Sequence, residues 1–61
     1  MYKLMEQHNG LYIFYDGSSY FISVDHTPFN FFDDKKFNTV EKARLFIDSI
    51  LLIFSFLPRG G

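Results

Sequence analysis

Two polar residues and a nearby charged run carry the side chains that acid–base or metal chemistry would use. The run DDKK at 33–36 offers Asp33 and Asp34 as a carboxylate pair, and Asp25 and His26 precede it in the chain. Carboxylate and imidazole groups together suit a hard or borderline divalent cation. Their spacing matches no known ligand pattern, and two acids beside two lysines neutralise one another in water. We therefore predict a solvated loop here, with no metal site and no cofactor.

A second set of residues has the side chains of a nucleophile and its base. Ser18 and Ser19 form a serine pair, and His8 lies ten residues before Ser18. A serine can be activated by a histidine base, but no Gly-x-Ser-x-Gly elbow accompanies these serines, and their surroundings are typical of a turn. The glycines lie at turns and in the tail rather than in a phosphate-binding loop. The sequence therefore predicts that the protein is not an enzyme.

Size and charge narrow the function classes further. The 61 residues carry a net charge of −1, so no strong field draws the chain to nucleic acid or to an anionic membrane. The chain has no cysteine, which excludes disulfides and thiolate zinc sites as a source of stability. Glu6 and His8 interrupt the N-terminal segment, so we expect no secretion signal and a cytoplasmic protein. A domain this small that lacks those supports often oligomerises.

The elements that position these residues begin with two turn signals. Asn9-Gly10 and Asp16-Gly17 readily take the positive φ angles of tight hairpin turns. They predict three antiparallel strands over about 2–8, 11–15 and 20–25. The predicted register places the following pairs opposite each other: His8 and Leu11, Leu4 and Tyr15, Met5 and Phe14, Tyr15 and Tyr20, Ile13 and Ile22, Leu11 and Val24.

Alternation along these strands divides the side chains between two faces of the sheet. The predicted core face carries Leu4, Leu11, Ile13, Tyr15, Tyr20, Ile22 and Val24. The other face, expected to be exposed, carries Lys3, Met5, Tyr12, Phe14, Phe21 and Ser23. Exposed aromatic rings on such a face could stack on the bases of a single-stranded nucleic acid.

The connection at 26–38 is unusually rich in phenylalanine. Pro28 restricts Thr27 to extended conformations and ends the third strand. Leaving a large aromatic side chain in water forgoes about 1.5–3 kcal/mol relative to burial, which a small domain can hardly lose. We therefore predict an ordered loop that buries at least two of four residues: Phe29, Phe31, Phe32 and Phe37.

A helix is predicted over about 39–57, followed by a tail at 58–61. Asn38 and Glu41 have the spacing of a capping box, and Pro58 ends the helical segment. One broad apolar face suits packing on the sheet and comprises Val40, Ala43, Phe46, Ile47, Ile50, Leu51, Ile53, Phe54 and Leu57. A separate apolar stripe on the opposite side comprises Leu45, Leu52 and Phe56, and one sheet face leaves nothing within the chain to cover it.

These elements place the chain in the α+β class, as a single domain over 1–61 in which a three-stranded antiparallel meander is followed by one C-terminal helix packed on the sheet. The segment FNTVEKARLFID resembles the helix that follows the sheet in integrase arm-type and AP2-like DNA-binding domains. That resemblance implies DNA binding through the sheet by basic residues. The strands here offer only Lys3, beside Glu6, Asp16 and Asp25, so they would neutralise phosphates poorly. Nucleic-acid binding through the aromatic face is therefore kept as the alternative function.

The function predicted first is a non-enzymatic protein-interaction module that forms a homo-oligomer, most simply a dimer. Its interface is expected to include Leu45, Leu52, Phe56, Phe29, Phe31 and Phe32. A composition rich in Phe, Ile, Asn, Lys and Tyr is typical of small phage or mobile-element proteins that bind and inhibit a host protein. The apolar segment at 45–57 is shorter than the ~20 residues that span a bilayer, so a membrane partner is not expected.

Overall fold

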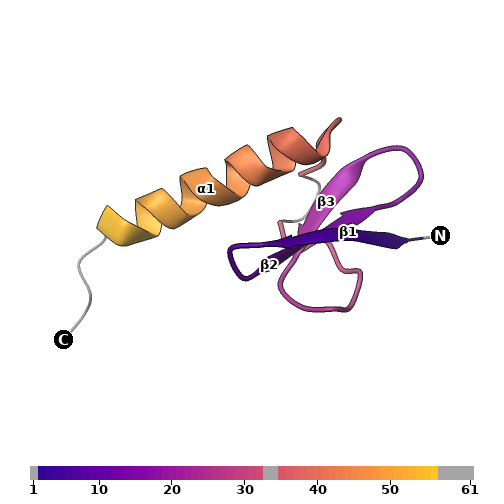
Figure 1. The fold of residues 1–61 in the computed structure, drawn as a ribbon, viewed down its shortest axis with the longest axis horizontal. Helices are drawn as coiled ribbons and strands as arrows, with labels where there is room; N and C mark the ends of the chain where they lie inside the picture. The colour runs from indigo at the N-terminus through magenta and orange to yellow at the C-terminus, as the bar shows by residue number, and fades with distance from the viewer. Residues whose placement is uncertain (1, 33–34, 57–61) are drawn as a thin grey trace.

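A computed structural model describes residues 2–32 and 35–56, with side chains described as far as residue 53 within the helix. The elements follow one another as β1 (Lys3–His8), β2 (Leu11–Tyr15), β3 (Tyr20–Ser23) and α1 (Val40–Phe56). The strands form one antiparallel sheet in the order β1-β2-β3, and α1 crosses one of its faces (Figure 1). The predicted α+β meander followed by a helix is confirmed.

Both predicted hairpin turns form. Asn9 and Gly10 have φ angles of 51° and 87°, and Gly17 has a φ of 104°, all in the left-handed region that these residues tolerate best. The predicted pairings across the second hairpin are present, since Tyr15 lies opposite Tyr20 and Ile13 opposite Ile22. β3 ends at Ser23, so the expected pair of Leu11 and Val24 does not form.

β1 contains a bulge at Met5 that the sequence did not predict. Leu4 lies opposite Phe14 and Glu6 lies opposite Ile13, so Met5 is the extra residue. The predicted pairs of Leu4 with Tyr15 and of Met5 with Phe14 are therefore wrong. The bulge moves Leu4 to the other face, where its side chain is exposed rather than in the core. Glu6 lies between the bulge and the Asn9-Gly10 turn, so its position opposite Ile13, on the helix side of the sheet, follows from that turn.

The core lies where the middle of the sheet meets the first half of α1. Ile13, Ile22, Ala43 and Ile47 are completely buried there. Partly buried side chains surround them, namely Leu11, Tyr20, Phe32, Phe37, Val40, Phe46 and Leu51. The predicted core faces are thus confirmed at their centres. Three residues predicted in the core are exposed. Val24 lies beyond the end of β3, Leu4 is moved to the other face by the bulge, and Ile53 lies on α1 past the end of the sheet.

The sheet face away from the helix is covered rather than open. Phe14 and Phe21 are only 4% and 3% exposed, and their rings stack with centroids 5.7 Å apart. The Tyr2 ring meets Phe21 edge-on at 5.6 Å. The prediction that Phe14 and Phe21 would be exposed is wrong, whereas Met5 is exposed as expected. Lys3 is exposed, but it lies opposite Tyr15 and therefore on the other side of the sheet from the one predicted.

The 24–37 connection provides further cover on that face. Ser23 is fully buried and its hydroxyl donates to the Thr27 carbonyl at 2.7 Å. The Tyr12 ring, half-buried, lies 4.7 Å from the His26 ring, centroid to centroid. In Figure 1 the connection runs on the opposite side of the sheet from α1. The molecule therefore has three layers, a helix, a sheet and a loop.

The same connection also covers the outer edge of β3. Phe37 and Tyr20 exchange two backbone hydrogen bonds of 2.8 Å, and the Phe31 N–H donates to the Ile22 carbonyl at 2.9 Å. These bonds satisfy backbone groups that an edge strand would otherwise present to other chains.

The aromatic loop buries half of its phenylalanines on the helix side. The Phe32 and Phe37 rings lie 5.1 and 5.3 Å from the Phe46 ring, and both side chains are half-buried against the core. Phe29 and Phe31 remain exposed. The prediction that at least two of the four phenylalanines are buried is therefore met only in part, because Phe32 and Phe37 are half-buried and not fully enclosed. Order of the loop stays a prediction.

The helix begins one residue later than predicted because a different residue caps it. The Lys42 N–H donates to the Thr39 hydroxyl at 3.1 Å, so Thr39 is the N-cap and Asn38 is not. A capping box needs a glutamate or glutamine three positions after the N-cap, and Lys42 stands there. The expected capping box of Asn38 with Glu41 therefore does not form. At the other end, Leu57 and the tail at 58–61 lie outside the described residues.

We predict that Ile47→Ala lowers the free energy of unfolding by about 2 to 5 kcal/mol, since it opens a cavity at the centre of the core. A domain of this size has only about 3–5 kcal/mol in total, so the variant should be largely unfolded in thermal melts followed by circular dichroism. Ile53→Ala is the matched control, because it makes the same chemical change at an exposed position of the same helix. Equal losses in the two variants would contradict the observed packing.

Candidate functional site

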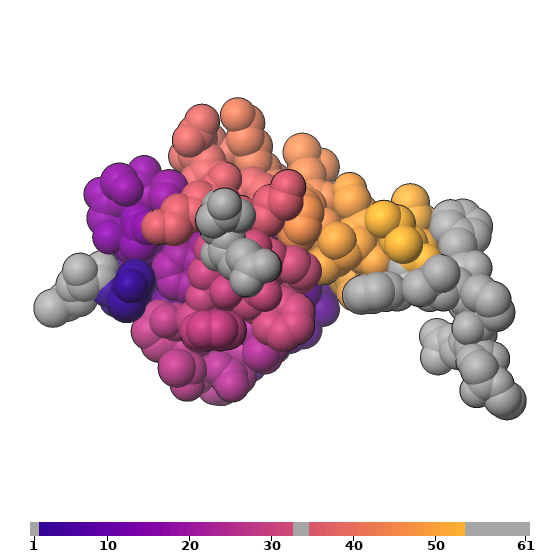
Figure 2. All heavy atoms as spheres, turned by 180° about the vertical axis from the view of Figure 1, so that it is seen from behind, coloured from indigo at the N-terminus to yellow at the C-terminus, as the bar shows by residue number. Residues whose placement is uncertain are grey.

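The most exposed apolar side chains of the helix lie on the side opposite the core. Leu45 is 65% exposed and Leu52 is 58% exposed, whereas Ala43 and Ile47, on the side of the helix that faces the sheet, are completely buried. We call Leu45, Leu52 and Phe56 the helix stripe; the Phe56 side chain lies outside the described residues. Figure 2 shows the second half of α1 extending past the body formed by the sheet and the loop. The helix stripe is therefore accessible at both of its described members.

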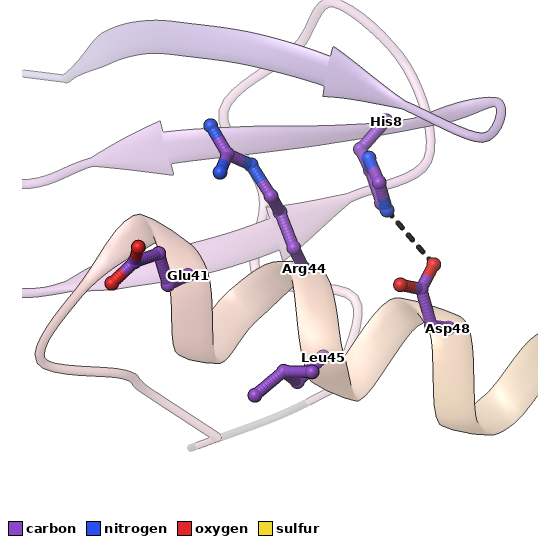
Figure 3. Close-up of a pocket in the computed structure, with 5 residues that line it drawn as sticks. All are labelled: His8, Glu41, Arg44, Leu45 and Asp48. Atoms are coloured by element: carbon purple, nitrogen blue, oxygen red, sulfur yellow. Dashed lines mark hydrogen bonds and ion pairs between the residues drawn. The ribbon is translucent and has the colours of Figure 1, made fainter.

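A shallow hollow of about 420 Å³ lies beside the helix stripe, between α1 and the end of β1. Its lining residues are His8, Glu41, Arg44, Leu45 and Asp48 (Figure 3). Leu45 thus belongs both to the stripe and to the hollow. The other four side chains are polar, and three of them already have partners within the chain.

Arg44 forms a two-pronged ion pair with Glu6 of β1. Its Nε and Nη2 atoms each donate to a Glu6 carboxylate oxygen at 2.6 Å. Such a paired geometry is the strongest form of a charge-assisted hydrogen bond between side chains. The Arg44 hydrogen bonds hold the pKa of Glu6 below its ordinary value, and the same bonds raise the pKa of Arg44. The pair therefore ties the edge strand to the helix.

A second contact between the strand and the helix lies one turn further along α1. His8 Nε2 lies 2.8 Å from the Asp48 Oδ1 atom, and the Asn9 side-chain amide donates to the same oxygen at 2.9 Å. A histidine beside a carboxylate supplies two of the three members of a catalytic triad, but the described residues that line the hollow include no serine, threonine or cysteine. The hollow is consequently a place of strand–helix contact that carries no nucleophile.

The two serines and His8 are too far apart along the sheet to act together as a nucleophile and its base. Ser18 and Ser19 lie in the turn after β2, whereas His8 precedes the turn before β2, so the two sets are at opposite ends of that strand. The serines instead support the turn, because the Asp16 carboxylate accepts their backbone N–H groups at 2.9 and 2.8 Å.

Asp16 also accepts a hydrogen bond from the Lys36 ammonium at 2.6 Å. That bond, followed by those from the Ser19 and Ser18 backbones, holds the pKa of Asp16 far below its ordinary value. Lys36 is thereby fixed to the second hairpin, one residue before the Phe37 bridge to β3.

The structure describes only two of the four residues considered as metal ligands. The Asp25 carboxylate accepts the Thr27 N–H at 2.8 Å, and His26 lies against Tyr12. Asp33 and Asp34 lie outside the described residues. Within residues 2–32 and 35–56, no three potential ligands are grouped closely enough to hold a metal ion. The absence of a metal site stays a prediction.

The aromatic loop offers a second exposed apolar surface. Phe29 is 64% exposed and Phe31 is half in solvent, although Phe31 is held to β3 by its backbone and lies edge-on to Phe32. Phe32, expected at an interface, instead packs on the core. Two of the three loop residues assigned to an interface are thus exposed.

Sequence reasoning missed Glu6, Arg44 and Asp48 as a group. Arg44 and Asp48 are one turn apart on α1, a spacing that is visible in the sequence. The register set by the Asn9-Gly10 turn places Glu6 opposite Ile13 on the core face. No sequence signal gives the position of the helix along the sheet, so none brings Arg44 and Asp48 beside Glu6.

Comparison of the chain with protein-family models, with curated proteins and with solved structures found no match. Among the described residues, no helix combines the length and the apolar character needed to cross a membrane. The functional assignment therefore depends on the exposed surfaces and on the contacts beside them.

We predict that Glu6→Gln lowers the melting temperature near neutral pH and flattens its dependence on acid. A carboxyl group whose pKa is lower in the folded state stabilises the fold above its unfolded pKa, and that stabilisation is lost as the pH falls. The wild type should therefore lose stability below about pH 5, where carboxyl groups begin to take up protons, and the variant should lose less.

Arg44→Gln is the partner variant for this measurement. It removes the other half of the same ion pair, so it should flatten the dependence on acid in the same way. The double variant Glu6→Gln/Arg44→Gln should lose little more than either single variant. Losses that simply add across pH 3 to 7, a range of about four units around the ordinary carboxyl pKa, would show that the Glu6–Arg44 contact contributes nothing specific.

Proposed function

We propose that this protein is a non-enzymatic protein–protein interaction module that pairs with a second copy of itself through the helix stripe. The observation that carries the proposal is the exposure of Leu45 and Leu52 on a helix whose opposite face is already used for the core. Apolar patches of this kind mark association sites in many proteins. A closed two-fold pair is the commonest way to cover one.

The energetics of burial support a second copy as the first occupant. Each large side chain that becomes fully buried contributes about 1.5–3 kcal/mol before the entropy of association is subtracted. In a two-fold pair Leu45 and Leu52 each count twice, once from each copy. Since α1 extends past the sheet, the two helices can meet along this line while each sheet lies on the outer side.

The exposed Phe29 and Phe31 support a further part of the same proposal, a surface for a foreign protein such as the host target of a phage or mobile-element inhibitor. They lie on the connection and not on the helix stripe. Burial of Phe14 and Phe21 removes the aromatic platform on which single-strand nucleic-acid binding would depend, so no observation favours that alternative.

We predict that the wild type sediments as a dimer at micromolar concentration and that Leu52→Glu converts it into a folded monomer. A carboxylate placed in an apolar interface must be desolvated without a partner, which opposes association. Analytical ultracentrifugation gives the mass, and circular dichroism shows that the variant stays folded.

Phe29→Glu is the comparison variant, because Phe29 is exposed to a similar degree but lies on the loop. It should remain dimeric if the helix stripe is the interface. Dimer loss in Phe29→Glu with none in Leu52→Glu would assign self-association to the loop instead. A folded, monomeric wild type would overturn the proposal.

A further inference from the structure

We infer that the two copies pair with their α1 helices parallel and in register, and that Lys42 of each copy binds Glu41 of the other. This inference rests on the proposed function, because it specifies how the helix stripe is covered. Three features of α1 lead to it: the spacing of its exposed residues, the position of Asp48, and two charged side chains that make no hydrogen bond or ion pair within the described residues.

The exposed residues of α1 follow the spacing of a coiled-coil seam. Lys42, Leu45, Ser49 and Leu52 are all exposed and are separated by three, four and three residues. This is the a-d-a-d pattern of two heptads, with leucine at both d positions. Ala43 and Ile47, completely buried against the sheet, occupy the opposite b and f positions. The seam is therefore directed away from the body of the domain.

An antiparallel arrangement of this seam places like charges together. If Leu45 of one helix packs on Leu52 of the other, the two-fold axis passes between residues 48 and 49, and each Asp48 lies beside Asp48 of the second copy. The Asp48 side chain is half exposed, and its position is fixed by His8 and Asn9, so it cannot simply turn away. Like charges held next to each other oppose association.

A parallel arrangement separates the two Asp48 side chains and brings opposite charges together. In a parallel pair the g positions lie on opposite sides of the seam, so Asp48 of one copy is kept from Asp48 of the other. The side chain at each a position packs beside the preceding g position of the partner, which brings Lys42 next to Glu41 of the second copy. The two Lys42 residues also face each other, but each long side chain can turn toward Glu41 of the second copy, whereas Asp48 is held in place by His8 and Asn9.

Neither the Lys42 nor the Glu41 side chain makes a hydrogen bond or ion pair within the described residues. Glu41 acts on Arg44 only through its charge, because Arg44 gives its hydrogen bonds to Glu6, so the Glu41 carboxylate can still accept a hydrogen bond from the second copy. Leu45 and Leu52 then each meet their own counterpart.

The absence of cysteine from the chain allows a direct test by crosslinking. Lys42→Cys should form a symmetric disulfide under mild oxidation, because parallel helices place the two copies of residue 42 side by side. An antiparallel pair centred between Leu45 and Leu52 separates them by about 20 Å along the helix axis. Lys35→Cys is the matched control, since Lys35 is an exposed lysine on the loop. Non-reducing gels should show a dimer band for Lys42→Cys at a rate well above that of Lys35→Cys.

Charge reversal provides a second readout that does not depend on oxidation. Lys42→Glu and Glu41→Lys should each weaken the homodimer about tenfold, because two attractive contacts become two repulsive ones. An equimolar mixture of the two variants should recover the affinity of the wild type, since the mixed pair restores both attractions.

The outcomes separate this inference from the proposed function. A dimeric wild type that shows neither the Lys42→Cys crosslink nor recovery on mixing would overturn the parallel arrangement and leave the helix-stripe dimer in place. A monomeric wild type in sedimentation would overturn both.

Discussion

Contact between α1 and the centre of the sheet is the constraint on which the other features of the structure depend. Ala43 is the small residue in this contact, and its methyl group lies among Ile13, Ile22 and Ile47 with no exposed surface. A larger side chain at position 43 would move the helix away from the sheet and open gaps around the isoleucines. The bonds of Arg44 to Glu6 and of Asp48 to His8 have the short distances observed only because the helix lies this close to β1.

Exposure of the helix stripe is a consequence of the same contact. A helix has one side facing the sheet, and in this chain the sheet is only three strands wide. Ala43 and Ile47 occupy that side of the helix and pack on Ile13 and Ile22 of the sheet. The loop adds Phe32 and Phe37 around Phe46. The loop between β3 and α1 is also apolar, but it crosses the far face of the sheet, where it contacts Ser23 and Tyr12. No segment of the described chain is left for Leu45 and Leu52.

The parts of the fold that could be predicted from the sequence are those decided by neighbouring residues. The Asn9-Gly10 turn, the second hairpin and the helix depend on local backbone preferences and on short periodic patterns, and all were placed within about two residues. The bulge at Met5 has no local signal in the sequence, and the contact between Glu6 and Arg44 joins residues that are 38 positions apart. Burial of Phe14 and Phe21 likewise depends on where distant segments pass. Of the candidate site, the stripe was predictable from periodicity, whereas the polar hollow beside it was not.

The backbone cover on β3 also decides where the sheet can grow. Phe31 and Phe37 bond to Ile22 and Tyr20 along the outer side of β3. A strand from another chain could add to the sheet on this side only after it had broken these bonds and displaced the loop.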